Sequence, residues 1–265
     1  MQVWSLSSGS SGNCYLVREG ATLLLVEAGL GSRRVAREMA ALGLSHPTAS
    51  AVLVSHEHAD HWLSAEALAA RWRAPLLCTP GTLGAECVNP SVDHEPLIPG
   101  RSIRVGTLAV ECFSVPHDAR DPVGFFIRSD AASCWLATDM GFVGEEMIER
   151  ARGADLVILE ANHDVEMLRR GPYPQHLKER ILSERGHLSN EEAASALIRM
   201  AVGRPRRFWL AHLSQTNNSP GLALASVREV LRREGLEKLK VSVALRDRRS
   251  LFWDSEAELE QLPLS

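Results

Sequence analysis

The segment of this chain richest in reactive side chains lies at residues 56–61, which read His-Glu-His-Ala-Asp-His. It follows the apolar run at residues 51–54, so we expect a buried strand that ends where the polar side chains begin. Imidazole and carboxylate donors without a nearby cysteine suit Zn²⁺, Mn²⁺ or Fe²⁺ in a hydrolytic site, not a structural thiolate zinc site. An exposed polar loop is the alternative, but a chain with only ten histidines would seldom place three of them this way.

Further histidine and aspartate residues stand where predicted strands end. His117, Asp139, His163 and His212 each follow an apolar run. Donors that are far apart in the sequence, but all at strand ends, can converge on one edge of a rigid two-sheet scaffold, as a hydrolytic metal site requires. Two metal ions about 3.5–4 Å apart could share a bridging carboxylate and a hydroxide, which would be the nucleophile.

The elements that must position these donors are strands in the centre and helices outside. The second half is expected to begin near Ser133 and to repeat the pattern of the first, and a Ser189…Glu192 capping box marks one helix start. Two packed sheets with helices on both outer faces would bury the apolar sides of these elements. The expected strands are 2–4, 14–17, 21–26, 51–55, 76–79, 102–105, 108–115, 123–128, 134–137, 156–160, 207–210, 241–244 and 251–253, and the expected helices are 33–42, 64–72, 143–152, 189–202 and 222–233.

Length and composition indicate a globular protein with an ample core. The chain has 265 residues, 45% of them hydrophobic, and we expect a single domain over residues 1–265. Its five cysteines are scattered without a CxxC pair, and four adjoin apolar runs, which favours buried free thiols in a reducing compartment. We see neither a signal-peptide pattern nor an apolar stretch long enough to span a membrane, so we expect a cytoplasmic protein without a membrane partner.

The charge balance does not identify a partner by itself. The net charge is −4, so the chain is not a polycation, and it has only three lysines among 29 basic residues. The abundant arginine suits phosphate recognition. A GC-rich genome explains the same excess of arginine over lysine, and nothing in the sequence predicts an oligomeric state.

Several motifs resemble those of one protein family. Residues 56–61, with His117, Asp139 and His212, resemble the ligand set of the metallo-β-lactamase fold. Other motifs narrow the resemblance to the bacterial YycJ/WalJ proteins and extend it over essentially the whole chain. They are Ser8–Asn13 with Cys14 (SGSSGNC), Thr138-Asp139-Met140-Gly141, Glu160-Ala161-Asn162-His163-Asp164, Gly186-His187-Leu188-Ser189-Asn190, and Ala211-His212-Leu213-Ser214 with Asn217 and Asn218.

The resemblance implies an α+β protein with the four-layer αββα metallo-β-lactamase fold, in which two mixed sheets lie between helices. It also implies two divalent metal ions, Zn or Mn, held by the matching residues of this chain. The first ion would be bound by His56, His58 and His117 and the second by Asp60, His61 and His212, with Asp139 bridging the two and Asp60 counted among the catalytic residues as well.

The implied activity is phosphodiester hydrolysis, with a 5′-to-3′ exonuclease acting on DNA through a metal-bridging hydroxide. The chain between His117 and Asp139 is too short for the tRNA-gripping arm of ribonuclease Z, and the chain from Asp139 to His212 is too short for the inserted domain of ribonuclease J-like enzymes. A small-molecule hydrolase, above all a cyclic phosphodiesterase, is the first alternative. A silent binding module on the same fold is the second, and the complete set of ligand types argues against it.

Two departures from the family pattern concern the surroundings of the metal loop. Where the third strand usually ends in Asp-Ala-Gly, this chain has Glu27-Ala28-Gly29. If that carboxylate braces the loop, one extra methylene must be accommodated. The residues after His61 are Trp62-Leu63-Ser64 without the usual glycine, so the loop is expected to enter its helix differently.

The acid–base groups implied by the resemblance are Glu160 and His187, which match the Glu and His of the ribonuclease Z relay. A carboxylate that holds an imidazole oriented and protonated lets it donate a proton to a leaving 3′-oxygen. A strand-end carboxylate and a helix-flanking polar residue are the plainer interpretations. His163 could share the donor role, bind the substrate's 5′ end, or satisfy a buried hydrogen bond.

Candidate substrate contacts lie after the last ligand and in the segment between His163 and His187. Ser214, Asn217 and Asn218 could donate to a phosphate, and Ser189 begins a helix whose free N–H groups suit an anion, although helix capping also explains it. The segment between the two histidines is rich in Gly, Pro and basic residues, so we expect a cap over a nucleic-acid channel. Its basic residues are Arg169, Arg170, Lys178, Arg180 and Arg185, opposed by Glu166, Glu179 and Glu184, so a solvated helix is the alternative.

Overall fold

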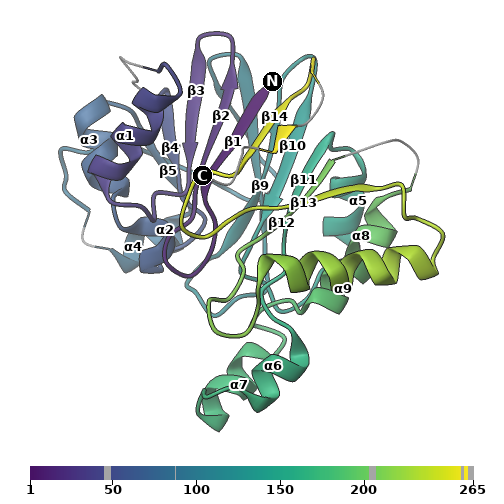
Figure 1. Cartoon of the computed structure of the whole chain (residues 1–265). Coiled ribbons are helices and arrows are strands. Elements are labelled where there is room, and N and C mark those ends of the chain that lie inside the picture. Colours follow the sequence, from purple (N-terminus) through teal and green to yellow (C-terminus); the bar gives the residue numbers. More distant parts are fainter. Residues whose placement is uncertain (45–48, 87, 203–206, 258–259, 262–265) are drawn as a thin grey trace.

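The computed structural model describes residues 1–265 except 45–48, 87, 203–206, 258–259 and 262–265. Two β-sheets pack face to face with helices on their outer faces, which confirms the expected α+β, αββα arrangement (Figure 1). The first sheet has the order β15 (Glu260–Gln261), β14 (Leu251–Asp254), β1 (Gln2–Ser7), β2 (Cys14–Glu19), β3 (Thr22–Val26), β4 (Ala51–Leu53), β5 (Leu76–Cys78) and β6 (His94–Pro96).

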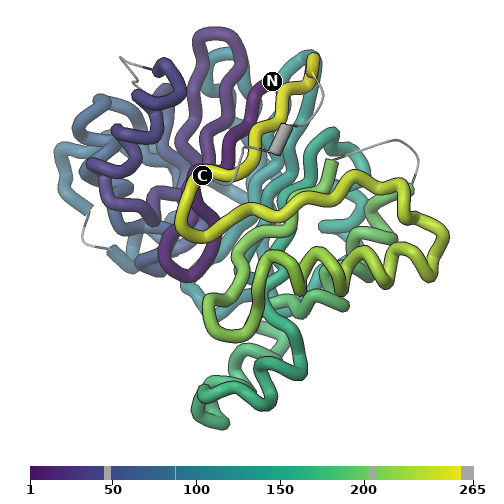
Figure 2. Tube along the Cα trace, viewed as in Figure 1, coloured from purple at the N-terminus to yellow at the C-terminus, as the bar shows by residue number. Residues whose placement is uncertain are grey.

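The division between the sheets differs from the expected division of the chain near Ser133. Strands that precede Ser133 already belong to the second sheet, because the β8–β9 hairpin pairs antiparallel with β10. The chain also returns to the first sheet at its end, where β14 lies beside β1 (Figure 2). The second sheet has the order β13 (Lys240–Val243), β12 (Arg207–Ala211), β11 (Leu156–Glu160), β10 (Ser133–Ala137), β9 (Val123–Arg128), β8 (Leu108–Ser114) and β7 (Ser102–Val105).

Helices cover the two sheets from opposite sides, and one pair projects away from them (Figure 1). α1 and α3 lie on the first sheet, and α5, α8 and α9 lie on the second. The expected capping box of α8 is present, since Ser189 Oγ accepts from Glu192 N and Ser189 N donates to Glu192. The helices are α1 (Ser32–Ala41), α2 (Ala59–Trp62), α3 (Ala65–Trp72), α4 (Pro80–Ala85), α5 (Glu145–Arg152), α6 (Val165–Arg170), α7 (Gln175–Ile181), α8 (Asn190–Met200) and α9 (Pro220–Arg233).

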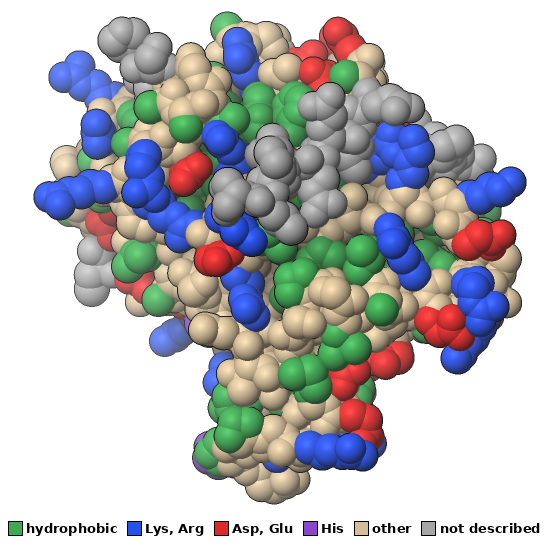
Figure 3. Space-filling view, in the orientation of Figure 1, with side chains coloured by type: hydrophobic (Ala, Val, Ile, Leu, Met, Phe, Trp, Pro, Cys, Tyr) green, Lys and Arg blue, Asp and Glu red, His purple; other side chains and the backbone are tan. Residues whose placement is uncertain are grey.

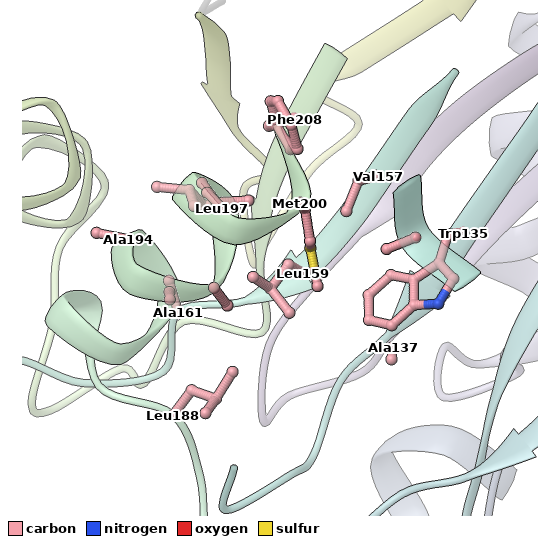
Figure 4. Close-up of a cluster of buried hydrophobic side chains, with 14 of the residues drawn as sticks. Trp135, Ala137, Val157, Leu159, Ala161, Leu188, Ala194, Leu197, Met200 and Phe208 are labelled. Atoms are coloured by element: carbon pink, nitrogen blue, oxygen red, sulfur yellow. The ribbon is translucent and has the colours of Figure 1, made fainter. Parts of the chain in front are cut away.

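Three apolar layers hold these four layers of structure together. One lies between α1, α3 and the first sheet, one between the two sheets, and one between the second sheet and α5, α8 and α9. β11 is buried on both faces: Leu156 and Ile158 face the other sheet, whereas Val157 and Leu159 face the helices (Figure 4). Its continuous apolar sequence follows from this double burial.

Two smaller expectations concern the cysteines and membrane-spanning segments. Cys14, Cys78, Cys112 and Cys134 are buried free thiols, whereas Cys87 lies outside the described residues. No described helix is both long and apolar enough to cross a bilayer.

Candidate metal centre

Polar side chains follow the ends of strands in both sheets, and they lie together at one edge of the molecule. β3 and β4 run parallel in the first sheet, and β10, β11 and β12 run parallel in the second. Their carboxyl ends lead to Glu27, His56, Asp139, Glu160 and His212. Residues that are distant in the sequence are therefore gathered at the ends of rigid elements, as the sequence predicted.

Three of the predicted ligands form a trio of ring nitrogens. His56 Nε2 lies 3.1 Å from His58 Nδ1, and His117 Nε2 lies 3.3 Å from the same atom. His56 and His117 are buried. The pKa of His56 is lowered, first by burial and then by the neighbouring His61. An unprotonated imidazole is the form that binds a metal ion.

The second predicted set lies beside the first. His212 Nε2 is 3.3 Å from Asp60 Oδ2, and His61 Nε2 is 3.6 Å from the same oxygen. Asp139 faces both sets: its Oδ2 is 3.0 Å from His61 Nε2, and its Oδ1 is 3.9 Å from His117 Nε2. This position suits the predicted bridging role of Asp139.

The donor set fits two divalent cations. In the first trio, three ring nitrogens converge, and a single N–H cannot satisfy all three. The second set combines two imidazoles with a carboxylate. Nitrogen and oxygen donors of this kind suit Zn²⁺ or Mn²⁺. All seven predicted ligands, His56, His58, Asp60, His61, His117, Asp139 and His212, belong to these adjoining groups.

Acceptors behind the site orient the imidazoles. His56 Nδ1 lies 2.9 Å from Ser55 Oγ, and His117 Nδ1 lies 3.3 Å from the carbonyl oxygen of Gly186. His212 Nδ1 lies 2.8 Å from Glu160 Oε1. Such contacts fix the ring orientation and the tautomer, so that the opposite nitrogen points to the metal position.

Glu27 takes the bracing role that the departure from the family pattern left open. Its Oε2 lies 3.1 Å from His61 Nδ1, and its backbone φ is +65°. Asp139 and His212 also have positive φ, at 59° and 53°. Non-glycine residues in this region are strained and often mark functional sites.

The metal loop continues directly into helical structure. α2 already begins at Ala59, inside the motif, and α3 begins at Ala65. Leu63 lies between the two helices and is exposed, while Ser64 N donates to the carbonyl oxygen of Ala28. The chain thus enters its helical region through two short helices.

Glu160 and His187 are in hydrogen-bond contact. His187 Nδ1 lies 2.8 Å from Glu160 Oε1, and Glu160 Oε2 accepts from the backbone N–H groups of Met140 and Leu188. Burial raises the pKa of Glu160, but His187 and His212 together outweigh burial and lower the pKa to about 2. Burial lowers the pKa of His187, but the Glu160 carboxylate outweighs burial and raises it. The pair therefore favours an ionised carboxylate beside a protonated imidazole.

His163 is buried away from these contacts. Within the described residues neither of its ring nitrogens has a hydrogen-bond partner, and burial lowers its pKa to about 4. Its backbone forms a bridge to Ser189 and accepts from Asn190 N. The imidazole is thus neutral near pH 7, and its predicted catalytic role remains a prediction.

The predicted phosphate contacts have different surroundings. Ser189 Oγ is engaged in the capping box, and Ser214 Oγ accepts from Asn217 N. The Asn218 amide donates to the carbonyl oxygens of Ala161 and Asn162. These contacts give Ser189 and Asn218 a structural role. The amide atoms of Asn217 are buried without a partner among the described residues.

The predicted cap is the pair of helices α6 and α7, which project below the sheets in Figure 1. It is tied to the metal centre, because Arg180 donates to Asp118 and Arg185 donates to the carbonyl oxygen of His117. Two further arginines pair with one carboxylate: Arg170 lies 2.9 Å and Arg169 3.7 Å from Glu166, and Lys178 Nζ donates to the Arg169 carbonyl oxygen. Much of the basic cluster is thus already compensated.

Asn13 contacts the centre, although its motif suggested no role for it. Its Oδ1 accepts from Gly9 N, which directs Nδ2 to His61 Nε2 at 3.0 Å and to Asp60 Oδ2 at 3.5 Å. In the same turn, Ser8 Oγ accepts from His212 N. Only the unusual Gly/Ser-rich composition of Ser8–Asn13 could have signalled that this turn folds under the ligands.

Comparison with known families agrees with this fold and site. The model described as "Beta-lactamase superfamily domain" matches residues 22–213. The chain therefore belongs to the β-lactamase superfamily, and its packed sheets and clustered donors make it a hydrolase of the metallo-β-lactamase fold.

Curated relatives place it more closely, as a WalJ/YycJ-like protein. Exodeoxyribonuclease WalJ of Streptococcus pneumoniae is 37% identical over 225 residues, which cover 82% of this chain and 83% of the relative. Exodeoxyribonuclease YycJ of Bacillus anthracis is 36% identical over 234 residues, which cover 87% of this chain and 89% of the relative.

Solved structures share the fold at lower identity. The metallo-β-lactamase fold protein YhfI from Bacillus subtilis has a TM-score of 0.72 at 17% identity and covers 96% of this chain and 99% of its own. Zn²⁺-bound PqqB from Methylobacterium extorquens has a TM-score of 0.68 at 19% identity, and the match covers 96% of this chain and 100% of the PqqB chain.

Proposed function

We propose that this protein is a metal-dependent phosphodiester hydrolase that acts as a 5′-to-3′ exonuclease on DNA. The observation that carries the proposal is the imidazole of His187, held by buried Glu160 and 3.6 Å from Asp139 Oδ1. Its side chain keeps 20% of its surface exposed, so a substrate can reach it. The names of the two exodeoxyribonuclease relatives support DNA as the substrate.

A proton donor at this position suits a poor leaving group. The 3′-oxygen released from a DNA strand is a basic alkoxide, and protonation in the transition state makes its departure easier. Glu160 keeps the His187 ring oriented and favours its protonated form. A lactone or an activated ester would not need this donor.

The other residues of the centre act by position and charge. When bound, two divalent ions would supply Lewis-acid stabilisation of the phosphate and an activated water. Glu27 and Glu160 orient His61 and His212, and the Asn13 amide lies beside Asp60. These contacts set the donor atoms in place before the substrate arrives, which lowers the cost of reorganisation.

A cyclic nucleotide phosphodiesterase is the second candidate. It is favoured by the pairing of cap arginines with Glu166 and Asp118, which leaves less free positive charge for a long strand. A cyclic phosphodiester also has a basic leaving oxygen, so the His187 donor would serve it equally.

One experiment separates the two activities. Protein reconstituted with Zn²⁺ or Mn²⁺ is incubated with single-stranded and duplex DNA labelled at either end, with RNA, and with cyclic nucleotides. The proposal expects a labelled mononucleotide at once from 5′-labelled DNA, and progressively shortened products from 3′-labelled DNA. Faster hydrolysis of cyclic nucleotides than of every DNA substrate would contradict it.

A further inference from the structure

One arginine of the cap lies beside the first trio of predicted ligands. Asp118 directly follows His117, and its Oδ1 lies 3.4 Å from His117 Nε2, the nitrogen that faces His58. The other oxygen, Oδ2, accepts a hydrogen bond from Arg180 Nε of α7. A single carboxylate therefore separates the Arg180 guanidinium from the candidate metal position.

The Arg180 guanidinium has donors that the described part of the protein does not use. Its side chain is 56% exposed, and within the described residues its Nε alone has a hydrogen-bond partner. Both Nη groups remain available to a ligand. A guanidinium binds phosphate through parallel N–H donors, and a carboxylate that holds Nε restricts the orientation of the guanidinium plane. Asp118 thus orients Arg180 without using its terminal donors.

A second arginine of the same segment is engaged with the backbone. Arg185 donates from Nε at 3.2 Å and from Nη2 at 3.0 Å to the carbonyl oxygen of His117. Two arginines thus contact consecutive residues with different results. Arg185 holds the backbone of a predicted ligand, whereas Arg180 is held by a side chain and retains its Nη donors.

Arg180 and His187 are held close together by one tight turn. His187 N donates to the carbonyl oxygen of Ile181 at 2.9 Å, and a Cβ atom on Gly186 would lie 2.1 Å from the same oxygen, so only glycine fits there. The His187 ring lies 3.6 Å from Asp139 Oδ1. The turn therefore brings a guanidinium and the proposed proton donor to the same centre.

The cap offers little free positive charge as a surface. Basic and acidic side chains lie next to each other on the projecting cap (Figure 3), in keeping with the pairs that Glu166 forms with Arg169 and Arg170. The pair of Arg180 and Asp118 is likewise neutral as a unit. Such a pair attracts a long polyanion weakly, but oriented N–H groups can still bind one phosphate by directed hydrogen bonds.

We propose that Arg180, oriented by Asp118, binds the phosphate that is hydrolysed at the metal centre. This inference rests on the proposed phosphodiester hydrolysis. The non-bridging oxygens of the reacting phosphate carry negative charge, and N–H donors that are already in place stabilise that charge. Asp118 is the positioning residue of the pair, and His187 remains the donor to the leaving oxygen.

The test compares a large substrate with a small one. For metal-reconstituted Arg180→Gln we expect kcat/KM to fall by roughly 10- to 100-fold on both DNA and bis-p-nitrophenyl phosphate, the usual effect of losing a hydrogen bond to a charged group. Loss of a contact to the strand outside the centre would leave the small substrate unaffected. Elemental analysis should find the metal content unchanged.

A second measurement does not depend on turnover. Calorimetric titration with inorganic phosphate should show binding to Arg180→Gln weakened by a similar factor. Arg180→Lys can still pair with Asp118 but has no second pair of oriented donors, so we expect it to recover only part of the loss. Full recovery in Arg180→Lys would assign the pair to fastening the cap and overturn the inference. Asp118→Asn, which keeps an oxygen acceptor for Arg180, should lose less activity than Asp118→Ala.

The matched control is Arg232→Gln on α9, where the arginine pairs with Glu229 at 3.0 Å. It also removes one arginine from a carboxylate pair, and it should leave both rates and phosphate binding unchanged. Undiminished phosphate binding by Arg180→Gln, or a loss confined to DNA, overturns the inference and leaves the proposed function standing. If the unmodified protein hydrolyses no phosphodiester, both fail. Circular dichroism confirms that each variant is folded.

Discussion

At the scale of single residues, one carboxylate links the candidate metal centre to the proposed proton donor, His187. Glu160 Oε1 lies 2.8 Å from both His187 Nδ1 and His212 Nδ1, while two backbone N–H groups bind Oε2. Removing the His187 ring leaves the other three contacts of Glu160 in place. The donor can therefore be deleted without dismantling the ligand set.

We predict that His187→Ala loses roughly 10²–10⁴-fold of the activity toward DNA, the usual contribution of a positioned acid. Hydrolysis of bis-p-nitrophenyl phosphate should fall much less, because p-nitrophenolate leaves without a proton. Rates on the two substrates, with metal content determined for each protein, check this. Equal losses on both substrates would assign His187 a structural or binding role instead.

The sequence predicted the donors of the centre better than it predicted their supports. The seven predicted ligands have distinctive side chains at or shortly after strand ends, and the structure brings them all together. Asn13 and the backbone of Glu27 were not predicted, because their roles depend on contacts across the fold. Asn13 reaches His61 only after the first turn folds against the metal loop, and the left-handed φ of Glu27 has no signal in residue type.

At the scale of elements, the cap carries less free positive charge than the number of its basic residues suggests. Sequence placed a basic cluster between His163 and His187, but folding into α6 brings Glu166 within reach of both Arg169 and Arg170. The three side chains together carry one net positive charge. These three side chains can then neutralise about one phosphate where two free arginines would neutralise two.

This compensation gives a prediction of its own. Replacing Arg169 and Arg170 together by Gln should flatten the salt dependence of DNA binding by at most about one unit, whereas Glu166→Gln should steepen it by a similar amount. Affinity titrations at several salt concentrations measure both. A flattening of two units by the double variant would show that Glu166 does not compensate the pair, and no change in either variant would remove the cap from the DNA path.

Elements with a strong periodic or apolar pattern were predicted well, and the short ones were not. β11 and α8 follow from a continuous apolar run and a capping box. α6 and α7 lie in a segment whose Gly and Pro residues conceal two short helices, and α6 begins at an Asp164 cap instead of an apolar stripe. The expected division near Ser133 failed because strand pairing, which sequence periodicity does not contain, assigns β7–β9 to the second sheet.

At the scale of the whole molecule, the centre joins the two sheets. Its predicted ligands follow strands of the first sheet, as does His61 in α2, and strands of the second sheet, as do Asp139 and His212. Bound metal ions would therefore add a connection between two halves that also meet through the apolar layer between the sheets. Because the intact donor set exists only in the folded chain, metal binding should stabilise the fold.

We predict two metal ions per chain and a large loss of thermal stability when they are removed. An ion present at about 1,000 times its Kd stabilises the folded state by about 4 kcal/mol, which corresponds to a Tm change of roughly 10 °C per site in a chain of this size. Elemental analysis and thermal unfolding of the reconstituted and chelator-treated protein measure both quantities. Asp139→Ala should bind fewer than two ions and show a smaller shift, because it removes the carboxylate that faces both sets. His187→Ala is the matched control and should keep both ions and the full shift. A reconstituted protein with at most one ion, or with the Tm of the chelated form, would contradict a two-metal centre between the sheets.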